Sequence, residues 1–292
     1  MNDNYLNDNT LIIMIGGGIG NQIFMLFAGI SKALDEERDF VIWLDLNGRE
    51  YFHNIFYLDY LSSKIVNNYE NFNYNLLTDN NITIYKGKSF PYIPIPNNQK
   101  AIQGYFQSYK YFNHNFDKIK KITNLDNYQD KYIIDSKIIS IHFRLGDYLT
   151  IPDGSFPILS IQYYINALKI LKEELILNND DILNYNIIVF GEKQNDNIIS
   201  EYIKILKSYS NLNFNKIYDL YSNINDADEL MIMSNCSHFI IANSTYSWCG
   251  AYMSKNNNKI VLYPHKTKFL GNWVNPNDLY DTFPNDWIEI PF

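Results

Sequence analysis

The chain has 292 residues, of which 46% are hydrophobic, so it is long enough for one large domain or two of ordinary size. Its formal net charge of −8 argues against a broad nucleic-acid footprint and against binding to an anionic membrane surface. No apolar run reaches transmembrane length, and no basic-plus-apolar signal opens the chain. The only cysteines, Cys236 and Cys249, suit a reducing compartment. We therefore expect a soluble, cytoplasmic protein without an integral membrane segment, whose oligomeric state the sequence leaves open.

Buried strands and helices alternate along two stretches of the chain. In the first, residues 11–15 predict a strand, 22–34 a helix and 40–44 a second strand, whereas 47–107 is irregular with weak short strands. The second stretch predicts strands at 138–141, 187–190, 239–242 and 260–263, and helices at 160–177, 195–206, 227–234 and 246–255. Such alternation is typical of parallel sheets. It predicts an α/β chain with two Rossmann-like domains, residues 1–130 and 131–292.

A glycine-rich motif, Ile15-Gly16-Gly17-Gly18-Ile19-Gly20-Asn21-Gln22, follows the first predicted strand. Glycines between a strand and a helix let the backbone approach a phosphate at the helix N-terminus. The match to a dinucleotide fingerprint is partial, because Asn21 stands where the third glycine belongs, although Asp45 lies where a ribose-binding acid would. The motif therefore indicates a hydroxylated or phosphorylated ligand, a dinucleotide, or only a tight turn.

Arginine is rare here, and Arg144 follows a predicted buried strand, in His142-Phe143-Arg144-Leu145-Gly146-Asp147-Tyr148. The chain has only two others, Arg38 and Arg49, and uses lysine elsewhere. A guanidinium can recognise a phosphate or carboxylate through two parallel hydrogen bonds, which lysine cannot do. Two interpretations stay open, an anion contact or a structural pair between Arg144 and Asp147.

A hydroxyl-rich motif, Asn243-Ser244-Thr245-Tyr246-Ser247, lies between a predicted strand and a predicted helix. Backbone amides, the helix dipole and the hydroxyls could form an anion site there. Simple N-capping by Ser244 or Thr245 is the alternative. Ligands of parallel sheets bind beyond the carboxyl ends of the strands, where four candidate residues are expected: Gly16, Arg144, Glu192 and Asn243.

Two other segments resemble known motifs only in part. Asp226-Ala227-Asp228 resembles the D-x-D of metal-dependent sugar transfer, but it opens a predicted helix, where capping is the favoured role. Gly87-Lys88-Ser89 resembles the end of a P-loop, but Ile82 occupies the position of the first glycine, which excludes that motif.

The motifs together, in this order, resemble the α-1,2-fucosyltransferase family, glycosyltransferase family 11. The segments that carry the resemblance are residues 16–24, 103–108, 142–148, 242–251 and 284–288. The resemblance implies a GT-B fold, in which two Rossmann-like domains face each other across a cleft. It implies inverting transfer of L-fucose from GDP-β-L-fucose to a glycan acceptor, in α-1,2 linkage to a terminal galactose or a similar sugar. Neither a metal nor another cofactor is expected.

The resemblance also implies roles for single residues. Arg144 would contact the β-phosphate and stabilise the GDP leaving group, and His142 would contact the nucleotide. The general base stays open between Asp147 and Asp153. The other donor-binding candidates are Gly18, Gly20, Asn21, Gln22, Glu192, Asn243, Ser244, Thr245 and Ser247.

Three departures from the family pattern bear on these roles. Leu145 replaces a second arginine, Gly191-Glu192-Lys193 replaces Ser-Asp-Asp, and Trp248-Cys249 replaces Trp-Trp. The role of Glu192 is therefore open, and the donor pocket could differ in shape. The alternatives are a transferase for another GDP-deoxysugar or another linkage, a dinucleotide-dependent oxidoreductase, and a non-catalytic glycan-binding protein.

Overall fold

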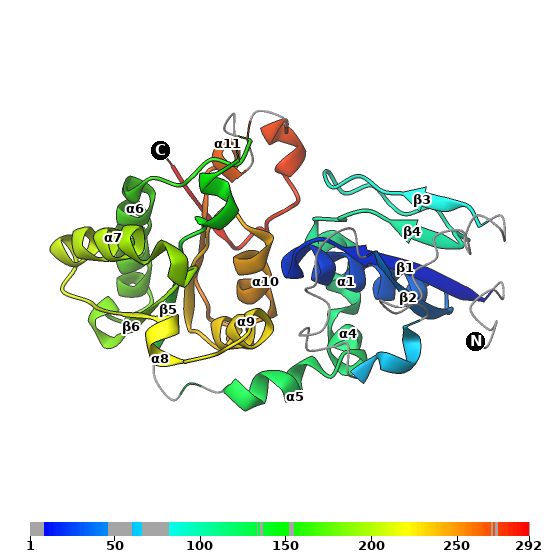
Figure 1. Ribbon diagram of the computed structural model, residues 1–292, viewed down its shortest axis with the longest axis horizontal. Helices are drawn as coiled ribbons and strands as arrows, with labels where there is room; N and C mark the ends of the chain where they lie inside the picture. The colour runs from blue at the N-terminus through cyan, green and yellow to red at the C-terminus, as the bar shows by residue number, and fades with distance from the viewer. Residues whose placement is uncertain are drawn as a thin grey trace. The chain divides into compact units, whose positions relative to one another are not determined.

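The computed structural model describes residues 9–45, 60–65, 82–132, 134, 137–151, 155–269, 271 and 274–291. The chain forms two compact units, each of which is described by itself (Figure 1). The first comprises Met1–Tyr128 and Asp278–Pro284, and the second comprises Gln129–Asn277 and Asn285–Phe292. Among the described residues, no helix has the length and apolar character needed to cross a membrane.

The first unit is built on a four-stranded sheet with the order β2-β1-β4-β3, in which all neighbours are parallel. Its strands are β1 (Thr10–Gly16), β2 (Asp39–Asp45), β3 (Ile84–Lys86) and β4 (Ala101–Gln103). All seven residues of β1 are buried, which explains its continuous apolar sequence. The strands β3 and β4 have three residues each, so the sequence there carries only a weak signal.

Helix α1 (Ile19–Asp35) connects β1 to β2 and is buried along most of its length (Figure 1). It begins three residues before the predicted helix, directly after Gly18, which takes the N-cap position. Phe24 and Phe27 make edge contacts with Phe112, with ring centroids 5.8 and 5.6 Å apart. Two short helices follow, α4 (Phe116–Ile122) and α5 (Leu125–Gln129). Because α1 is apolar on more than one side, both the sheet and this aromatic cluster bury it.

The second unit contains a six-stranded parallel sheet with the order β10-β9-β8-β5-β6-β7. Its strands are β5 (Ile138–His142), β6 (Asn186–Phe190), β7 (Asn213–Lys216), β8 (His238–Ile240), β9 (Val261–Pro264) and β10 (Ile288–Ile290). The apolar runs of the sequence did not predict β7 and β10. Both are edge strands, and the four residues of β7 are largely polar, so neither shows the apolar run of a central strand.

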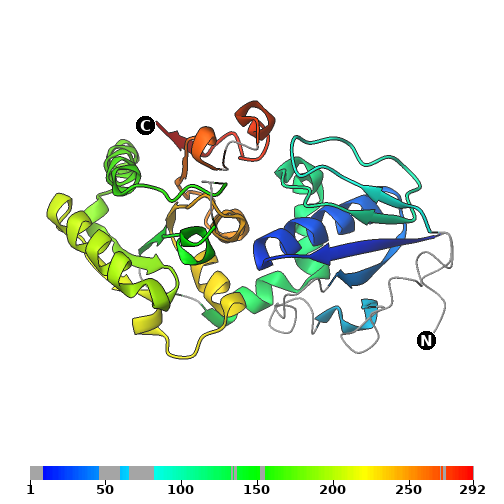
Figure 2. The ribbon, with the colours of Figure 1, turned by 45° about the horizontal axis from the view of Figure 1, so that its top comes forward.

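Helices cover both faces of this sheet. The long helices α6 (Ile161–Leu177) and α7 (Asp196–Tyr209) lie on one face, while α9 (Asp226–Ser234) and α10 (Thr245–Met253) lie on the other (Figures 1 and 2). Two helices are short, α8 (Ile217–Leu220) and α11 (Lys266–Phe269). The prediction of an α/β chain with two parallel sheets is therefore confirmed.

Strand order reverses at one point of each sheet. In the second unit, β5 is followed along the chain by β6 on one side and later by β8 on the other. In the first unit, β1 has β2 on one side and β4 on the other. The loops that leave such neighbouring strands in opposite directions open a crevice beyond their carboxyl ends, where ligands bind in doubly wound sheets.

A segment near the end of the chain returns to the first unit. Ser108 donates a hydrogen bond from its hydroxyl to the backbone carbonyl of Asp281 at 2.6 Å. The Asp281 carboxylate is buried and accepts the Tyr92 backbone N–H at 3.2 Å. It also pairs with Lys110 at 3.5 Å. The predicted domains, residues 1–130 and 131–292, have a single boundary, whereas the first unit also contains Asp278–Pro284.

Candidate functional site

The guanidinium of Arg144 lies between two carboxylates at the carboxyl ends of β5 and β6. Its Nη1 donates to Glu192 Oε1 at 2.5 Å, and its Nη2 pairs with Asp147. The guanidinium also stacks on the ring of Tyr148, 4.4 Å from the ring centroid. The structural pair with Asp147, left open as an alternative, is therefore present, but Arg144 also joins two loops that leave neighbouring strands.

The turn after β5 also contacts the segment that follows β8, the other neighbour of β5 in the sheet. Tyr148, in the 3-10 turn Gly146–Leu149, donates its hydroxyl hydrogen to the backbone carbonyl of Asn243 at 3.2 Å. Burial raises the pKa of Tyr148 above its ordinary value, so the phenol keeps its proton and acts as a donor. The loops that follow β5, β6 and β8 are thus joined by side-chain contacts. The sequence placed Arg144, Glu192 and Asn243 at these carboxyl ends.

His142, the last residue of β5, is only 5% exposed and neutral. Burial, together with the neighbouring Arg144 charge, lowers its pKa to about 3. Its ring lies 5.7 Å from that of Tyr246, measured between centroids. Its Nδ1 is buried and has no hydrogen-bond partner among the described residues. A neutral imidazole with an unpaired nitrogen can bind a polar ligand without contributing charge.

Two further buried polar atoms, on residues that follow β6 and β8, have no hydrogen-bond partner within the described part of the chain. Glu192 Oε2 is one, although Oε1 of the same carboxylate accepts from Arg144. Asn243 Oδ1 is the other, whereas its Nδ2 donates to the Pro157 carbonyl at 2.7 Å. Buried polar groups in native proteins are nearly always hydrogen-bonded, so each exception needs an explanation. Three exceptions at the carboxyl ends of three adjacent strands indicate a site for a polar ligand.

Glu229, on α9, adds an acidic group that no sequence motif indicated. Burial raises its pKa to about 8, with further contributions from the negative charges of Asp226 and Glu192. The charge of Glu192, which pairs with Arg144, is thus one of the causes of this raised pKa. The only sequence signal was an acidic side chain directly before the apolar run Leu230–Met233 of a helix.

The hydroxyl-rich motif at the start of α10 is occupied largely by backbone contacts. Ser244 is the N-cap residue, and its hydroxyl accepts the Tyr246 N–H at 3.3 Å. Ser247 is fully buried, and its hydroxyl accepts the Ala242 N–H at 3.2 Å. Thr245 is partly exposed. The capping alternative therefore describes Ser244, and Ser247 shapes the turn before the helix.

Three other expectations concern single positions. Leu145 is 2% exposed and belongs to the hydrophobic core of the second unit, so its position contributes no charge. Asn225 caps α9 by accepting the Asp228 N–H at 2.9 Å, which explains the acidic pair of the D-x-D-like segment as the start of a helix. Asp153 and the Asp45 side chain lie outside the residues that the structure describes.

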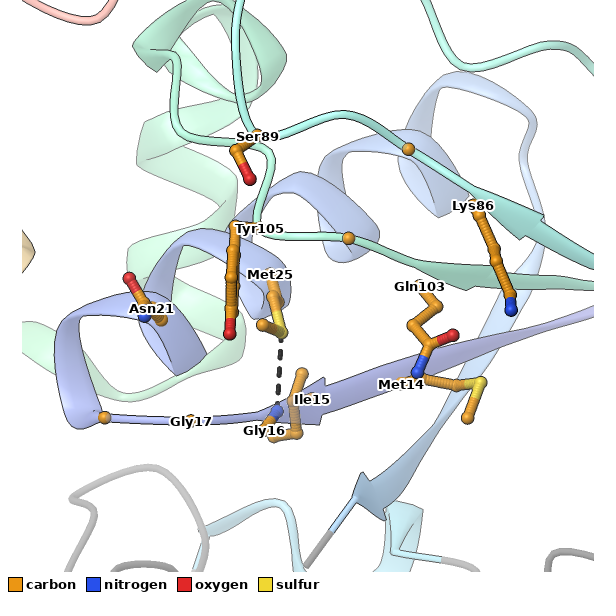
Figure 3. A pocket seen from close by; sticks show the side chains of 13 residues that line it. Met14, Ile15, Gly16, Gly17, Asn21, Met25, Lys86, Ser89, Gln103 and Tyr105 are labelled. Carbon is orange, nitrogen blue, oxygen red and sulfur yellow. Dashed lines mark hydrogen bonds between the residues drawn. The ribbon is translucent and has the colours of Figure 1, made fainter. Parts of the chain in front are cut away.

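The first unit contains a cavity of about 500 Å³ at its own reversal of strand order, between the ends of β1 and β4 (Figure 3). Gly18 and Asn21 line it, as do Gly87 and Ser89 of the segment that resembles the end of a P-loop. Gly20 and Gln22 are not among its lining residues. Gln22 is instead fully buried, and its side-chain amide donates to the Gly17 carbonyl at 2.7 Å, which stabilises the glycine turn.

Comparison with known proteins gives a family match over most of the chain. The model of glycosyl transferase family 11 matches residues 34–290. An alpha-1,2-colitosyltransferase of Escherichia coli is 25% identical, over 96% of this chain and 98% of that protein. An O-antigen biosynthesis glycosyltransferase of the same species, WbnK, is 26% identical, over 61% of this chain and 53% of its own length.

The fold also has distant counterparts among solved structures. The fucosyltransferase NodZ from Bradyrhizobium aligns with a TM-score of 0.45 and 9% sequence identity, over 85% of this chain and 94% of that one. The match to the family model covers residues of both units, and it includes Arg144 and the three residues that contact it, Asp147, Tyr148 and Glu192. The chain therefore belongs to glycosyl transferase family 11 and is a glycosyltransferase.

Proposed function

We propose that this glycosyltransferase moves a deoxy sugar, with L-fucose as the leading candidate, from a GDP donor to a glycan hydroxyl, with inversion and in α-1,2 linkage. The observation that carries the proposal is the position of Arg144 among three unpaired buried polar atoms: His142 Nδ1, Glu192 Oε2 and Asn243 Oδ1. A nucleoside diphosphate offers both the negative charge that a guanidinium binds and the donors and acceptors that unpaired atoms need.

Inverting transfer requires one bond to form as another breaks. The acceptor hydroxyl oxygen bonds to the anomeric carbon, and the bond between that carbon and the β-phosphate oxygen breaks with its electron pair leaving on GDP. Negative charge grows on the β-phosphate, where Arg144 stabilises it more strongly than in the ground state. Leu145 is buried, so Arg144 is the cation that this motif supplies.

The acceptor proton must pass to a base. Asp147 is 47% exposed and pairs with Arg144. A diphosphate that binds the guanidinium competes with this carboxylate, and the released Asp147 can then accept the proton. Asp153 is the second candidate from the sequence.

A second donor is favoured by one relative. The alpha-1,2-colitosyltransferase aligns with nearly the whole chain. Colitose differs from fucose in lacking one ring hydroxyl, and a site that hydrogen-bonds that hydroxyl would discriminate between the two sugars, whereas an apolar site would accept both. GDP-colitose is therefore the alternative donor of the same reaction.

Donor hydrolysis and transfer test the proposal. Purified protein would be offered GDP-fucose, GDP-colitose, GDP-mannose and UDP-galactose, each with and without a panel of glycans that end in galactose. We expect turnover of GDP-fucose, or of GDP-colitose for the alternative, and an α-1,2 product by NMR. Turnover of a different sugar nucleotide with neither of these would contradict the proposal, and NAD(P) binding without GDP binding would favour an oxidoreductase.

Arg144→Lys tests the mechanism. Because the single ammonium group of lysine cannot make the two parallel hydrogen bonds of a guanidinium, we expect kcat to fall by about 10²-fold or more in a protein that still folds. Arg38→Lys is the matched control, since the Arg38 side chain is 7% exposed and donates to Glu36, to the Gln99 carbonyl and to the Thr10 carbonyl. It should lower stability and leave kcat unchanged. Near-normal kcat in Arg144→Lys would refute the leaving-group role.

A further inference from the structure

Three residues in register form a row across the first unit's sheet and line its cavity. Met14 of β1 is the Cα partner of Gln103 on β4, and Gln103 is the Cα partner of Lys86 on β3. Residues in register on neighbouring strands point to the same face of a sheet. The row therefore presents an apolar group, an amide and an ammonium group side by side in the cavity (Figure 3).

Lys86 gives this cavity a positive charge. It is exposed, and the described lining contains no Asp or Glu and no other basic residue. No ion pair joins Lys86 to a carboxylate within the described part of the chain. Its side chain lines a cavity of about 500 Å³, which is within the size range of small-molecule sites (Figure 3). An anionic ligand would find a matching charge there.

Tyr105 gives the cavity an aromatic surface. Its side chain is 41% exposed, although the next residue, Phe106, is 1% exposed. Phe106 has a positive φ of 46°, an uncommon conformation for a non-glycine residue, and the preceding Gly104 has a φ of 154°. This backbone buries Phe106 and leaves the Tyr105 ring toward the cavity, between Asn21 and Gln103 (Figure 3). A flat, amphipathic ring can stack on the apolar face of a pyranose.

The amides beside the ring are held in place. Gln107 Nε2 donates to Asn21 Oδ1 at 2.7 Å, so the orientation of the Asn21 amide is fixed. Gly104 permits the ends of β3 and β4 to approach, because a Cβ at that position would lie 2.6 Å from the Gly87 carbonyl oxygen. Polar groups in fixed positions beside an aromatic ring are typical of sugar sites.

We propose that this cavity is the acceptor subsite of the transferase proposed above, and that it takes an acidic glycan: one sugar stacks on Tyr105, and a neighbouring sugar presents an anionic group to Lys86. The inference rests on the proposed function for the identity of the reaction, and it assigns Asn21, a donor-binding candidate from the family resemblance, to the acceptor instead. It adds an anionic group next to the terminal galactose or similar sugar that the family resemblance implies. The anionic group is a carboxylate or a phosphate, and the experiment separates them.

Three acceptors matched in size test the inference. These are galactosyl-glucose, galactosyl-glucuronate and galactosyl-glucose carrying a phosphate on its glucose. We expect KM for at least one anionic acceptor to be about 3- to 5-fold below that for the neutral one at low salt, with the advantage reduced at high salt. The better of the two anionic acceptors identifies the group. Equal KM values for all three would overturn the inference.

Variants of Lys86 and Tyr105 test which side chain causes the preference for an anionic acceptor. Lys86→Gln should remove the preference by raising KM for the anionic acceptors to the value for the neutral one. Lys88→Gln is the matched control, since Lys88 is exposed on the same segment and does not line the cavity. Tyr105→Ala should raise KM for every acceptor by roughly 3- to 10-fold, and Tyr105→Phe should preserve it. A preference that persists in Lys86→Gln, or a rise in KM for the donor, would overturn the inference.

Failure of the proposed function would be recognised separately. If no GDP sugar is hydrolysed or transferred, the reaction is wrong, and binding of the three disaccharides by saturation-transfer NMR still tests the cavity. Binding of an anionic disaccharide that Lys86→Gln weakens and Lys88→Gln does not weaken would support the site. Absence of binding by all three would refute it.

Discussion

Glu229 shows how a single side chain can be protonated near neutral pH. Its pKa of about 8 results first from burial and then from the charges of Asp226 and Glu192. A carboxyl group with such a pKa can donate a hydrogen bond below that pH and accept one above it.

This raised pKa predicts how stability varies with pH. The folded state holds the Glu229 proton more tightly than the unfolded state, whose pKa is near the ordinary value. The contribution to stability is therefore complete below the unfolded pKa and is lost as pH rises through about 8. In Glu229→Gln this loss disappears, so the free energy of unfolding should fall less between about pH 5 and pH 9 than in the parent.

Urea unfolding across that pH range measures the difference. Glu173→Gln provides the control, because Glu173 is exposed on α6 and should leave the pH profile unchanged. Parallel profiles for the parent and Glu229→Gln would show that the carboxyl group is ionised throughout.

At the scale of an element, the turn after β5 presents several functional groups together. Asp147 and Tyr148 belong to it, Arg144 lies two residues before it, and Gly146, its first residue, has a positive φ of 35°. A Cβ at Gly146 would collide with the Glu192 carboxylate and with Arg144 Nη1. Glycine is therefore needed for two reasons, the backbone conformation and the close approach of the loop that follows β6.

Gly146→Ala should consequently disturb the contact between Arg144 and Glu192. We expect a loss of stability of about 1–2 kcal/mol and a higher KM for the donor. Gly146→Asn separates the two causes, since asparagine tolerates a positive φ but still adds a Cβ. If the collision dominates, both variants raise KM for the GDP sugar. A normal KM in both, measured in initial-rate assays, would mean that the turn adapts without cost to the site.

At the scale of the whole molecule, the chain crosses between its two units more than once. Residues Asp278–Pro284 belong to the first unit, although the residues on both sides belong to the second. Asp281 holds this return through the Tyr92 N–H, the Ser108 hydroxyl and Lys110. The folding of the first unit therefore depends on residues near the chain's end.

Removal of the buried carboxylate should destabilise the first unit. Asp281→Ala leaves the Tyr92 N–H without this acceptor, which costs about 1–3 kcal/mol. Asp281→Asn retains an acceptor oxygen and should cost less. Asp286→Ala, at an exposed position five residues later, is the control and should be neutral. Thermal unfolding would contradict the account if Asp281→Ala and Asp286→Ala had the same midpoint.

Much of the fold could be predicted because its signals are local. The central strands β1, β5 and β6 are fully buried or nearly so, and their apolar runs are visible in the sequence. The short or polar strands β3, β7 and β10 lack this pattern. In the candidate site, sequence order placed Arg144 and Glu192 at strand ends, but it could not separate a structural pair from an anion contact.

The sequence by itself was enough to predict the alternation of strands and helices, to single out Arg144 as a rare arginine, and to indicate the family from the order of its motifs. Only the tertiary structure decided that Ser247 bonds within the turn before α10, that burial raises the pKa of Glu229, and that Lys86 shares a cavity with Tyr105. The physical reason is distance along the chain. Periodicity and apolar runs depend on neighbouring residues, whereas burial, pKa values and cavities depend on groups that only folding brings together.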